Sequence, residues 1–335
     1  MSAEVIRPGL LSTIQDAGRP GHRSVGVGPG GAMDEFAFRV ANLLVGNDAL
    51  VPAIEFFGAG PELEFRQAQL VSVCGSDVQL KVDGAARPAW HPLVVGPGQR
   101  LRADALAGVG YLAVHSGWQA DRWLGSCSTH LQAGVGGWNG KPLQKDPAAA
   151  AGDKNVIDWM HAPQGLYPDK SLPGWSIPAS VLNDVYDLQR HILCLPGPEW
   201  TVLDTSIRER FVSQVFRCTA DSNRMGFRLR SELLLQEVPL NLVSSPVNRG
   251  TVQLLPDGQT IILMADHQTT GGYPRVAALL RSEMPRFNRL LQGSDFYFAW
   301  CDMETAWSLW RDREELLQRI RQGCLFRFRQ YIYGS

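Results

Sequence analysis

Short apolar segments broken by glycine, proline or aspartate recur along the whole chain, and they restrict it to a fold built from many short strands. The chain has 34 glycines and 21 prolines among 335 residues. Segments rich in Val, Ile, Leu and aromatic residues that end in such turn residues are typical of strands. Five of them are 69–75, 78–84, 111–117, 191–197 and 260–266. We therefore predict a mainly β protein with a few helices.

Helical periodicity is limited to three stretches. One apolar helical face runs over residues 36–44, with Asp34 placed as an N-cap and Gly46 as a C-terminal stop. Residues 273–291 predict one or two short helices, and 303–335 predict an amphipathic helix followed by a strand. Regular alternation of strands and helices, the mark of a doubly wound parallel sheet, is missing.

The internal boundary is expected near residues 145–190, where Ala, Pro, Gly and Asp are frequent and periodicity is weak. This stretch would connect two packed β units, residues 1–145 and 190–300.

Charge and cysteine usage exclude several classes of protein. The net charge is -1, which gives no sign of the basic face of a nucleic-acid binder. The start of the sequence lacks a secretion signal and no stretch is long and apolar enough to span a membrane, so we expect a cytoplasmic protein. The six cysteines and seven histidines are scattered without ligand spacing, which predicts reduced thiols and no metal site.

Gly26, Gly28 and Gly31 match the spacing of a dinucleotide-binding fingerprint, and Glu55 follows at about the expected distance. That motif must follow a buried apolar strand, whereas the residues before Gly26 are polar and broken by glycine and proline. No P-loop sequence is present either. We therefore interpret the glycines as a turn ahead of a helix. The alternative is a loop whose backbone N–H groups bind an anion.

Several long motifs resemble the KipA/PxpC family, also labelled allophanate hydrolase subunit 2 or biotin-dependent carboxyltransferase domain. The resemblance covers roughly residues 4–310 in the expected order. It is carried by RPGLLSTIQDAGRPG (7–21), GAMDEFAFRVANLLVGND (31–48), LGSCSTHLQAGVGGWNGKPL (124–143), SNRMGFRL (222–229) and SSPVNRGTVQLLPDGQTIILMADHQTTGGYPRVA (244–277).

The resemblance implies cyclophilin-like β-barrel units and a role as one subunit of a heteromeric ATP-dependent 5-oxoprolinase. Such an enzyme converts 5-oxoproline, ATP and water to glutamate. The implied partners are a KipI-like (PxpB) subunit and a LamB/YcsF-like (PxpA) subunit, and the chain is expected to be inactive alone. ATP would bind in the complex at a site that the resemblance does not place.

Two other functions stay open. The first is a carboxyltransferase subunit of a urea-carboxylase or allophanate-type system that depends on biotin. No lysine of this chain has the setting of a biotin acceptor, so biotin would arrive on another chain. The second is a KipA-type regulatory protein that antagonises a kinase inhibitor without turnover.

Two segments carry the expected catalytic groups. Hydrolysis of a cyclic amide that ATP activates requires groups that hold a carboxylate, polarise the amide and stabilise phosphoryl charge. His267 is expected to transfer a proton, with Asp266 beside it, and Arg224 is expected to clamp a carboxylate or phosphate. The expected substrate-binding residues are Gln268, Thr269, Thr270, Gly271, Gly272, Tyr273, Asn223, Ser126 and Ser128. The alternative interpretation of each segment is a polar turn.

Three further segments contain polar or reactive side chains. Cys127 lies near His130 in the sequence, but nothing there indicates a lowered thiol pKa, so a nucleophilic role is not expected. Gln15, Asp16 and Arg19 are expected either at the site or in a buried polar turn. The chain departs from the family pattern in the 137–150 loop, at Gly30 and at Arg249, where proline is expected before the glycine.

Overall fold

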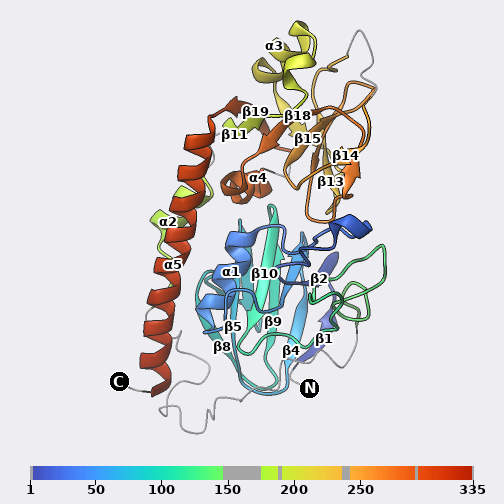
Figure 1. Ribbon diagram of the computed structural model, residues 1–335. Helices are drawn as coiled ribbons and strands as arrows, with labels where there is room; N and C mark the ends of the chain where they lie inside the picture. The colour runs from blue at the N-terminus through green and yellow to red at the C-terminus, as the bar shows by residue number, and fades with distance from the viewer. Residues whose placement is uncertain (1–2, 146–174, 188–190, 236–241, 291–292, 334–335) are drawn as a thin grey trace. The chain divides into compact units, whose positions relative to one another are not determined.

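The computed structural model of the protein describes residues 3–145, 175–187, 191–235, 242–290 and 293–333 (Figure 1). The chain divides into two compact units. Unit 1 comprises residues 1–18, 34–184 and 315–335, and unit 2 comprises residues 19–33 and 185–314. The boundary thus differs from the expected division at 145–190, since residues 19–33 belong with the second half of the chain. Most of the expected connection, 146–174 and 188–190, lies outside the described residues.

Unit 1 contains two antiparallel five-stranded sheets. The first has the order β1 (Ala3–Arg7), β4 (Glu62–Phe65), β9 (Arg100–Ala105), β6 (Val78–Val82) and β7 (Ala85–Arg87). The second has the order β2 (Leu11–Gln15), β3 (Ala53–Phe57), β10 (Val109–Val114), β5 (Gln69–Gly75) and β8 (Pro92–Val95). A single hydrophobic cluster contains side chains from both sheets, including Phe65 of the first and Val73 of the second. Burying such a shared core is what stabilises a two-sheet unit.

Helix α1 (Glu35–Leu44) packs on the second sheet of unit 1. Its N-terminus is capped as predicted, because the Asp34 carboxylate accepts a hydrogen bond of 3.0 Å from the backbone N–H of Ala37. Gly46 follows the helix with a φ of 74°, a conformation that glycine adopts without strain. The predicted helix, with its cap and stop, is confirmed.

Unit 2 is built around a closed barrel. Its strand order is β11 (His191–Pro196), β18 (Arg275–Leu279), β15 (Thr251–Leu254), β16 (Thr260–Leu263), β13 (Gly226–Arg230), β12 (Phe216–Cys218) and β19 (Asp295–Trp300). All neighbours are antiparallel except β11 and β19. A separate two-stranded ladder joins β14 (Ser245–Pro246) to β17 (Thr270–Gly271). Buried aromatic rings fill part of this unit, with Phe211 stacked on Phe298 at 4.8 Å.

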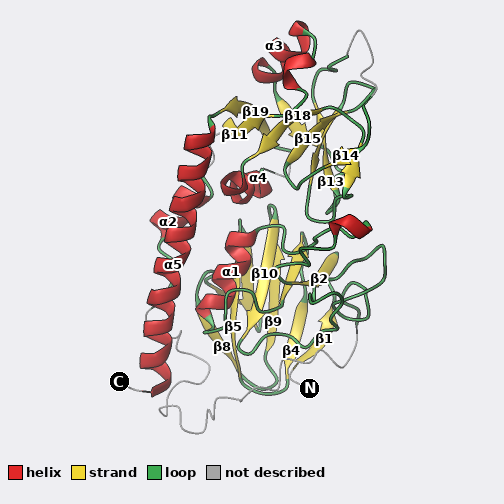
Figure 2. Cartoon of the chain, in the orientation of Figure 1, coloured by secondary structure: helices red, strands yellow, loops and turns green. Residues whose placement is uncertain are grey.

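The remaining helices are short, apart from the last one (Figure 2). They are α2 (Ala179–Val185), α3 (Thr205–Ser213), α4 (Met284–Arg289), α5 (Met303–Tyr333) and the 3₁₀ turns η1 (Arg23–Val25), η3 (Trp200–Val202) and η4 (Arg281–Glu283).

Two predictions of secondary structure were wrong. The first part of the predicted helical region 273–291 is strand β18, which pairs on both sides inside the barrel. Its helical periodicity is overridden because both neighbouring strands offer backbone hydrogen bonds. The predicted C-terminal strand is also wrong, since α5 continues to Tyr333. The overall prediction of a mainly β protein with a few helices is confirmed. In the part of the chain that the structure describes, no helix is long and apolar enough to cross a membrane.

Candidate functional site

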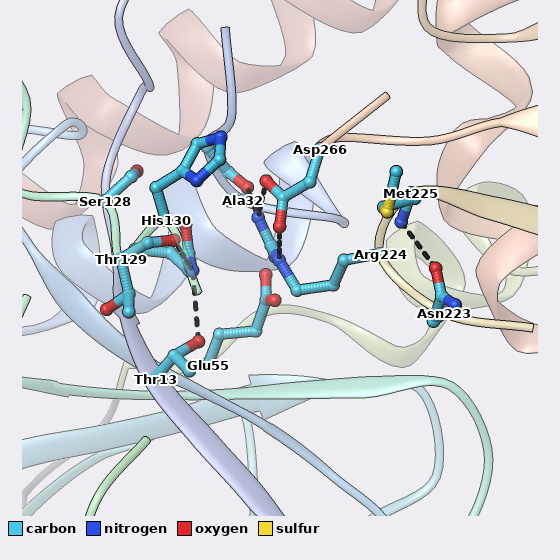
Figure 3. Close-up of polar contacts among 12 residues, drawn as sticks. Thr13, Ala32, Glu55, Ser128, Thr129, His130, Asn223, Arg224, Met225 and Asp266 are labelled. Carbon is cyan, nitrogen blue, oxygen red and sulfur yellow. Dashed lines mark hydrogen bonds and ion pairs between the residues drawn. The ribbon is translucent and has the colours of Figure 1, made fainter. Parts of the chain in front are cut away.

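The ends of β13 and β16 bring Arg224 and Asp266 together in unit 2 (Figure 3). The ladder of these strands continues past their ends, because the N–H of Asp266 donates to the carbonyl oxygen of Arg224 at 2.8 Å. The guanidinium then holds both carboxylate oxygens, with Nε to Oδ2 at 2.8 Å and Nη2 to Oδ1 at 3.0 Å. Both side chains are largely buried, so this bidentate pair is a fixed part of the structure.

Arg224 also donates from Nη2 to the carbonyl oxygen of Gly31 at 2.7 Å. The structure therefore places Arg224 as a link between Asp266 and the glycine-rich loop, in the interior of unit 2. Its expected role as a clamp on a bound carboxylate is not visible in this arrangement. What the geometry provides is positioning of the segment that carries His267.

His267 follows Asp266 directly and is 1% exposed. Its Nδ1 lies 2.5 Å from the carbonyl oxygen of Gln268. A carbonyl can only accept, so Nδ1 carries the proton and the neutral ring presents a lone pair at Nε2. Among the described residues, Nε2 has no hydrogen-bond partner. Burial lowers the pKa of His267 below its ordinary value, and the charges of Arg23 and Arg249 lower it further.

Gln268 connects His267 to Gln253 of β15. Its side-chain Nε2 donates to Oε1 of Gln253 at 3.5 Å, at the long limit for a hydrogen bond. Gln253 is 1% exposed, and within the described residues its own Nε2 has no partner. A Cβ at Gly271 would lie 2.6 Å from that nitrogen, so a larger residue there would displace the carboxamide. We call Gln253, Arg224, Asp266, His267 and Gln268 the strand-end cluster.

The glycine-rich loop packs against this cluster. A Cβ at Gly28 would lie 2.8 Å from the carbonyl oxygen of His267, and one at Gly30 would lie 3.6 Å from Oδ1 of Asp266. Arg249 donates to the carbonyl oxygens of Ala32 and Met33 at the end of the loop. At Gly28 and Gly30, protein backbone and side chains therefore occupy the space that a larger side chain would need.

The other part of the apparent dinucleotide fingerprint is also accounted for. Glu55 lies in strand β3 and is fully buried. Its Oε2 accepts a hydrogen bond of 2.6 Å from the hydroxyl of Tyr111, and that hydroxyl accepts from the N–H of Asp34 at 2.8 Å. Glu55 therefore belongs to the interior of unit 1. These contacts agree with the interpretation that the motif is no nucleotide fingerprint.

The remaining predicted residues of unit 2 lie at the edge of the cluster. The carbonyl oxygen of Thr269 accepts from the N–H of Val247, and Thr270 pairs with Pro246 in the β14–β17 ladder. Gly272 is half-buried, and Tyr273 is 45% exposed. Asn223 is exposed, and its Oδ1 accepts from the N–H of Met225 at 2.8 Å, which fixes the turn before β13.

Ser126 and Ser128 lie in unit 1, where they bind Asp16. Their hydroxyls donate to Oδ1 of that carboxylate at 2.6 and 2.7 Å, and the N–H of Cys127 donates to Oδ2 at 2.6 Å. The N–H of Gly18 adds a further hydrogen bond of 2.8 Å. This is a buried polar turn of the kind weighed for Asp16. Burial and the Asp16 charge raise the pKa of Cys127, which disfavours a thiolate nucleophile.

Sequence reasoning missed Gln253 and Arg23, and it noted Arg249 only as a departure from a family pattern. In the sequence, Gln253 is a single polar residue within an apolar strand segment, and no motif identifies it as a functional candidate. Arg23 donates to the side-chain oxygen of Asn248, a partner that lies far away in the sequence. Only the fold brings these residues to the strand-end cluster. Among the described residues, no group of three or more His, Cys, Asp or Glu side chains is arranged to hold a metal ion.

The chain is thus a two-unit β protein with buried polar side chains at strand ends in unit 2 and around Asp16 in unit 1. A family model described as carboxyltransferase domain, subdomain A and B, matches residues 25–300, and the chain belongs to this family.

Curated relatives match nearly the whole chain. The C-subunit of 5-oxoprolinase from Escherichia coli strain K12 is 33% identical over 95% of this chain and 97% of its own length. The C-subunit of 5-oxoprolinase from Haemophilus influenzae is 34% identical over 93% of this chain and 95% of its own length. The solved structure of the urea amidolyase of K. lactis matches with a TM-score of 0.83 at 24% identity. That match covers 95% of this chain and 20% of the amidolyase chain, so it shows the fold.

Proposed function

We propose that this chain is a subunit of an ATP-dependent 5-oxoprolinase, which converts 5-oxoproline, ATP and water to glutamate, ADP and phosphate. The observation that carries the proposal is the 33% identity to the C-subunit of the Escherichia coli 5-oxoprolinase over 95% of this chain and 97% of that relative. A match along both full lengths supports an equivalent place in an equivalent complex.

The strand-end cluster supplies chemistry that suits a cyclic amide. The amide of 5-oxoproline is a weak electrophile, and phosphorylation of its oxygen by ATP would provide a better leaving group. His267 is the group placed to accept a proton, because its neutral ring holds a buried lone pair at Nε2. Arg224 and Asp266 act as positioning residues, since they fix the backbone on which His267 lies.

In this proposal the chain works with two further subunits, one KipI-like and one LamB/YcsF-like, and is inactive without them. ATP binds in the complex, and the enzyme is cytoplasmic.

We also propose that the closed barrel of unit 2 is of the cyclophilin type.

A second candidate is a carboxyltransferase subunit of a urea-carboxylase-like system. It is favoured by the description of the matching family and by a putative urea carboxylase of Emericella nidulans, which is 34% identical over 96% of this chain. This chain covers only 26% of that relative, so carboxylation would need further domains or chains.

Reconstitution separates these functions. The chain is co-expressed with its KipI-like and LamB/YcsF-like partners, and glutamate formation from 5-oxoproline is measured with and without ATP, omitting each subunit in turn. Glutamate that requires both ATP and this chain supports the proposal. An assembled complex that forms no glutamate rules out this substrate and favours either the biotin-dependent reaction or a regulatory role.

Two variants then test the site. His267→Ala should lower kcat by roughly 100-fold or more, the usual contribution of a general base. Arg224→Lys should lower kcat less strongly, because lysine keeps the charge but cannot hold Asp266 with two parallel bonds. Arg217→Lys is the matched control, since Arg217 forms a half-exposed ion pair with Asp295 elsewhere in unit 2. Equal activity in the Arg224 and Arg217 variants would remove the positioning role.

A further inference from the structure

Two buried side chains in unit 2 each have one end fixed and the other end without a partner. Among the described residues, neither Nε2 of His267 nor Nε2 of Gln253 forms a hydrogen bond, although both residues are 1% exposed. Leaving a buried polar group unpaired is unfavourable, so a buried nitrogen without a partner in the protein is a candidate contact for a ligand or an ordered water.

A single residue, Gln268, holds the fixed end of both groups. Its carbonyl oxygen accepts a hydrogen bond from Nδ1–H of His267, and its side chain donates to Oε1 of Gln253. The two free nitrogens are therefore set to opposite roles. Nε2 of His267 accepts, since the neutral ring has its proton on Nδ1, and the carboxamide Nε2 of Gln253 donates.

An acceptor and a donor that contact the same ligand are together complementary to the edge of a cis amide. In a ring amide the N–H and the carbonyl oxygen point to the same side, whereas the ordinary trans amide directs them to opposite sides. We propose that His267 and Gln253 form a recognition pair for this edge, in which Nε2 of His267 accepts the ring N–H and Nε2 of Gln253 donates to the carbonyl oxygen. The identification of the ligand as 5-oxoproline rests on the proposed function.

The surroundings favour an anionic ligand that carries such an edge. Arg23 and Arg249 are close enough to His267 for their charges to lower its pKa. One nitrogen of Arg23 binds Asn248, and its Nη2 is buried without a partner among the described residues. A carboxylate on the ligand would form an ion pair with the guanidinium of Arg23. Urea presents the same donor and acceptor edge but has no carboxylate.

The first test compares ligands on the unchanged protein. Binding of 5-oxoproline, of its lactone analogue 5-oxotetrahydrofuran-2-carboxylate and of urea is measured by titration calorimetry, on the full chain and on the reconstituted complex. The lactone keeps the carboxylate and the carbonyl but places a ring oxygen against the lone pair of His267. It should bind roughly 10- to 100-fold more weakly than the lactam, the range expected for one unpaired buried group.

Variants assign the two contacts. In the His267→Leu variant, the affinities for the lactone and the lactam should differ by no more than roughly threefold, because the acceptor that distinguishes the two ligands is gone. Gln253→Met should weaken both ligands by about tenfold and leave their ratio unchanged, because the carbonyl contact is common to both. His191→Leu and Gln259→Met alter exposed side chains of the same types in unit 2 and serve as controls. Thermal melting of each variant separates loss of binding from loss of folding.

The outcomes of these experiments show separately whether the recognition pair fails and whether the proposed function fails. Equal affinity for lactam and lactone in the unchanged protein overturns the recognition pair, even when the complex forms glutamate. Binding of neither 5-oxoproline nor urea by the chain or by the complex overturns it as well. Selective binding of urea, with no glutamate formed, supports the recognition pair and rejects 5-oxoproline as the substrate.

Discussion

At the scale of single residues, Gly271 allows the sharpest test of the cluster's packing. A methyl group at this position would lie 2.6 Å from Nε2 of Gln253, a distance that forces a neighbour to move. We expect Gly271→Ala to push the carboxamide away and to lower the affinity for 5-oxoproline by about tenfold, which titration calorimetry measures.

Gly272→Ala provides the comparison for this variant. A methyl group there meets its nearest neighbour, Oγ of Ser244, at 3.5 Å, which is an ordinary contact. It should therefore reduce affinity much less than Gly271→Ala. If the two variants bind equally well, Gln253 is not held where the ligand needs it.

A second prediction at the scale of single residues concerns Asp16 in unit 1. Its carboxylate accepts from two serine hydroxyls and two backbone N–H groups, all between 2.6 and 2.8 Å. Asp16→Asn replaces one acceptor oxygen with a donor that faces another donor. We expect it to lower the free energy of unfolding by about 2–4 kcal/mol, which denaturant titration measures. A loss below about 0.5 kcal/mol would mean that the turn does not depend on this charge.

At the scale of elements, one glycine within the C-terminal part of α5 and one that packs against it allow substitutions with opposite expected effects on stability. Gly323 lies within the helix and a Cβ there meets nothing within 4 Å, so Gly323→Ala should raise the free energy of unfolding by about 0.5–1 kcal/mol. Gly46→Ala should lower it, because the methyl group would lie 2.6 Å from the ring of Phe328 and φ is 74°. Denaturant titrations of both variants measure the difference. A stabilising Gly46→Ala would contradict the packing of Phe328 on Gly46.

Strands and helices were predicted correctly where the local residue pattern agrees with the burial of the side chains in the fold. The strand prediction 69–75 coincides with β5, and the helix after Asp34 was found with its cap. The prediction was wrong for Arg275–Leu279, because the choice between helix and strand there depends on β11 and β15, which pair with β18 from distant parts of the chain.

At the scale of the whole molecule, the sequence singled out the candidate segment that holds Asp266 and His267, but it did not predict how the segment is packed. Asp266 and His267 were identified from the resemblance, whereas Gln253 enters only because β15 lies beside β16 in the barrel. The assignment of residues 19–33 to unit 2 also escaped prediction, since it depends on hydrogen bonds such as those of Arg249 to Ala32 and Met33. Local patterns carry no information about such pairings across the chain.

The stability of the folded chain should depend on pH through its buried histidines. Burial lowers the pKa of both His267 and His115 in the folded state below the ordinary value of 6.5. The unfolded chain therefore binds protons more readily, and the free energy of unfolding should be constant above about pH 7 and fall as the pH drops below about 6.5. Glu199, whose pKa is lowered mainly by its hydrogen bond to Arg275, contributes only at more acidic pH, below its ordinary value of 4.5.

Denaturant titrations between pH 7.5 and pH 5 measure this histidine contribution. His267→Gln, which cannot gain a charge, should lose less stability than the unchanged protein over this interval, whatever its stability at pH 7.5. His115→Gln tests the second group in the same way, and the double variant should show the smallest loss because the two residues lie in different units and act independently. If the unchanged protein and the double variant lose stability in parallel from pH 7.5 to pH 5, the two imidazoles are not held neutral by burial, and the acceptor role of His267 Nε2 loses its physical basis.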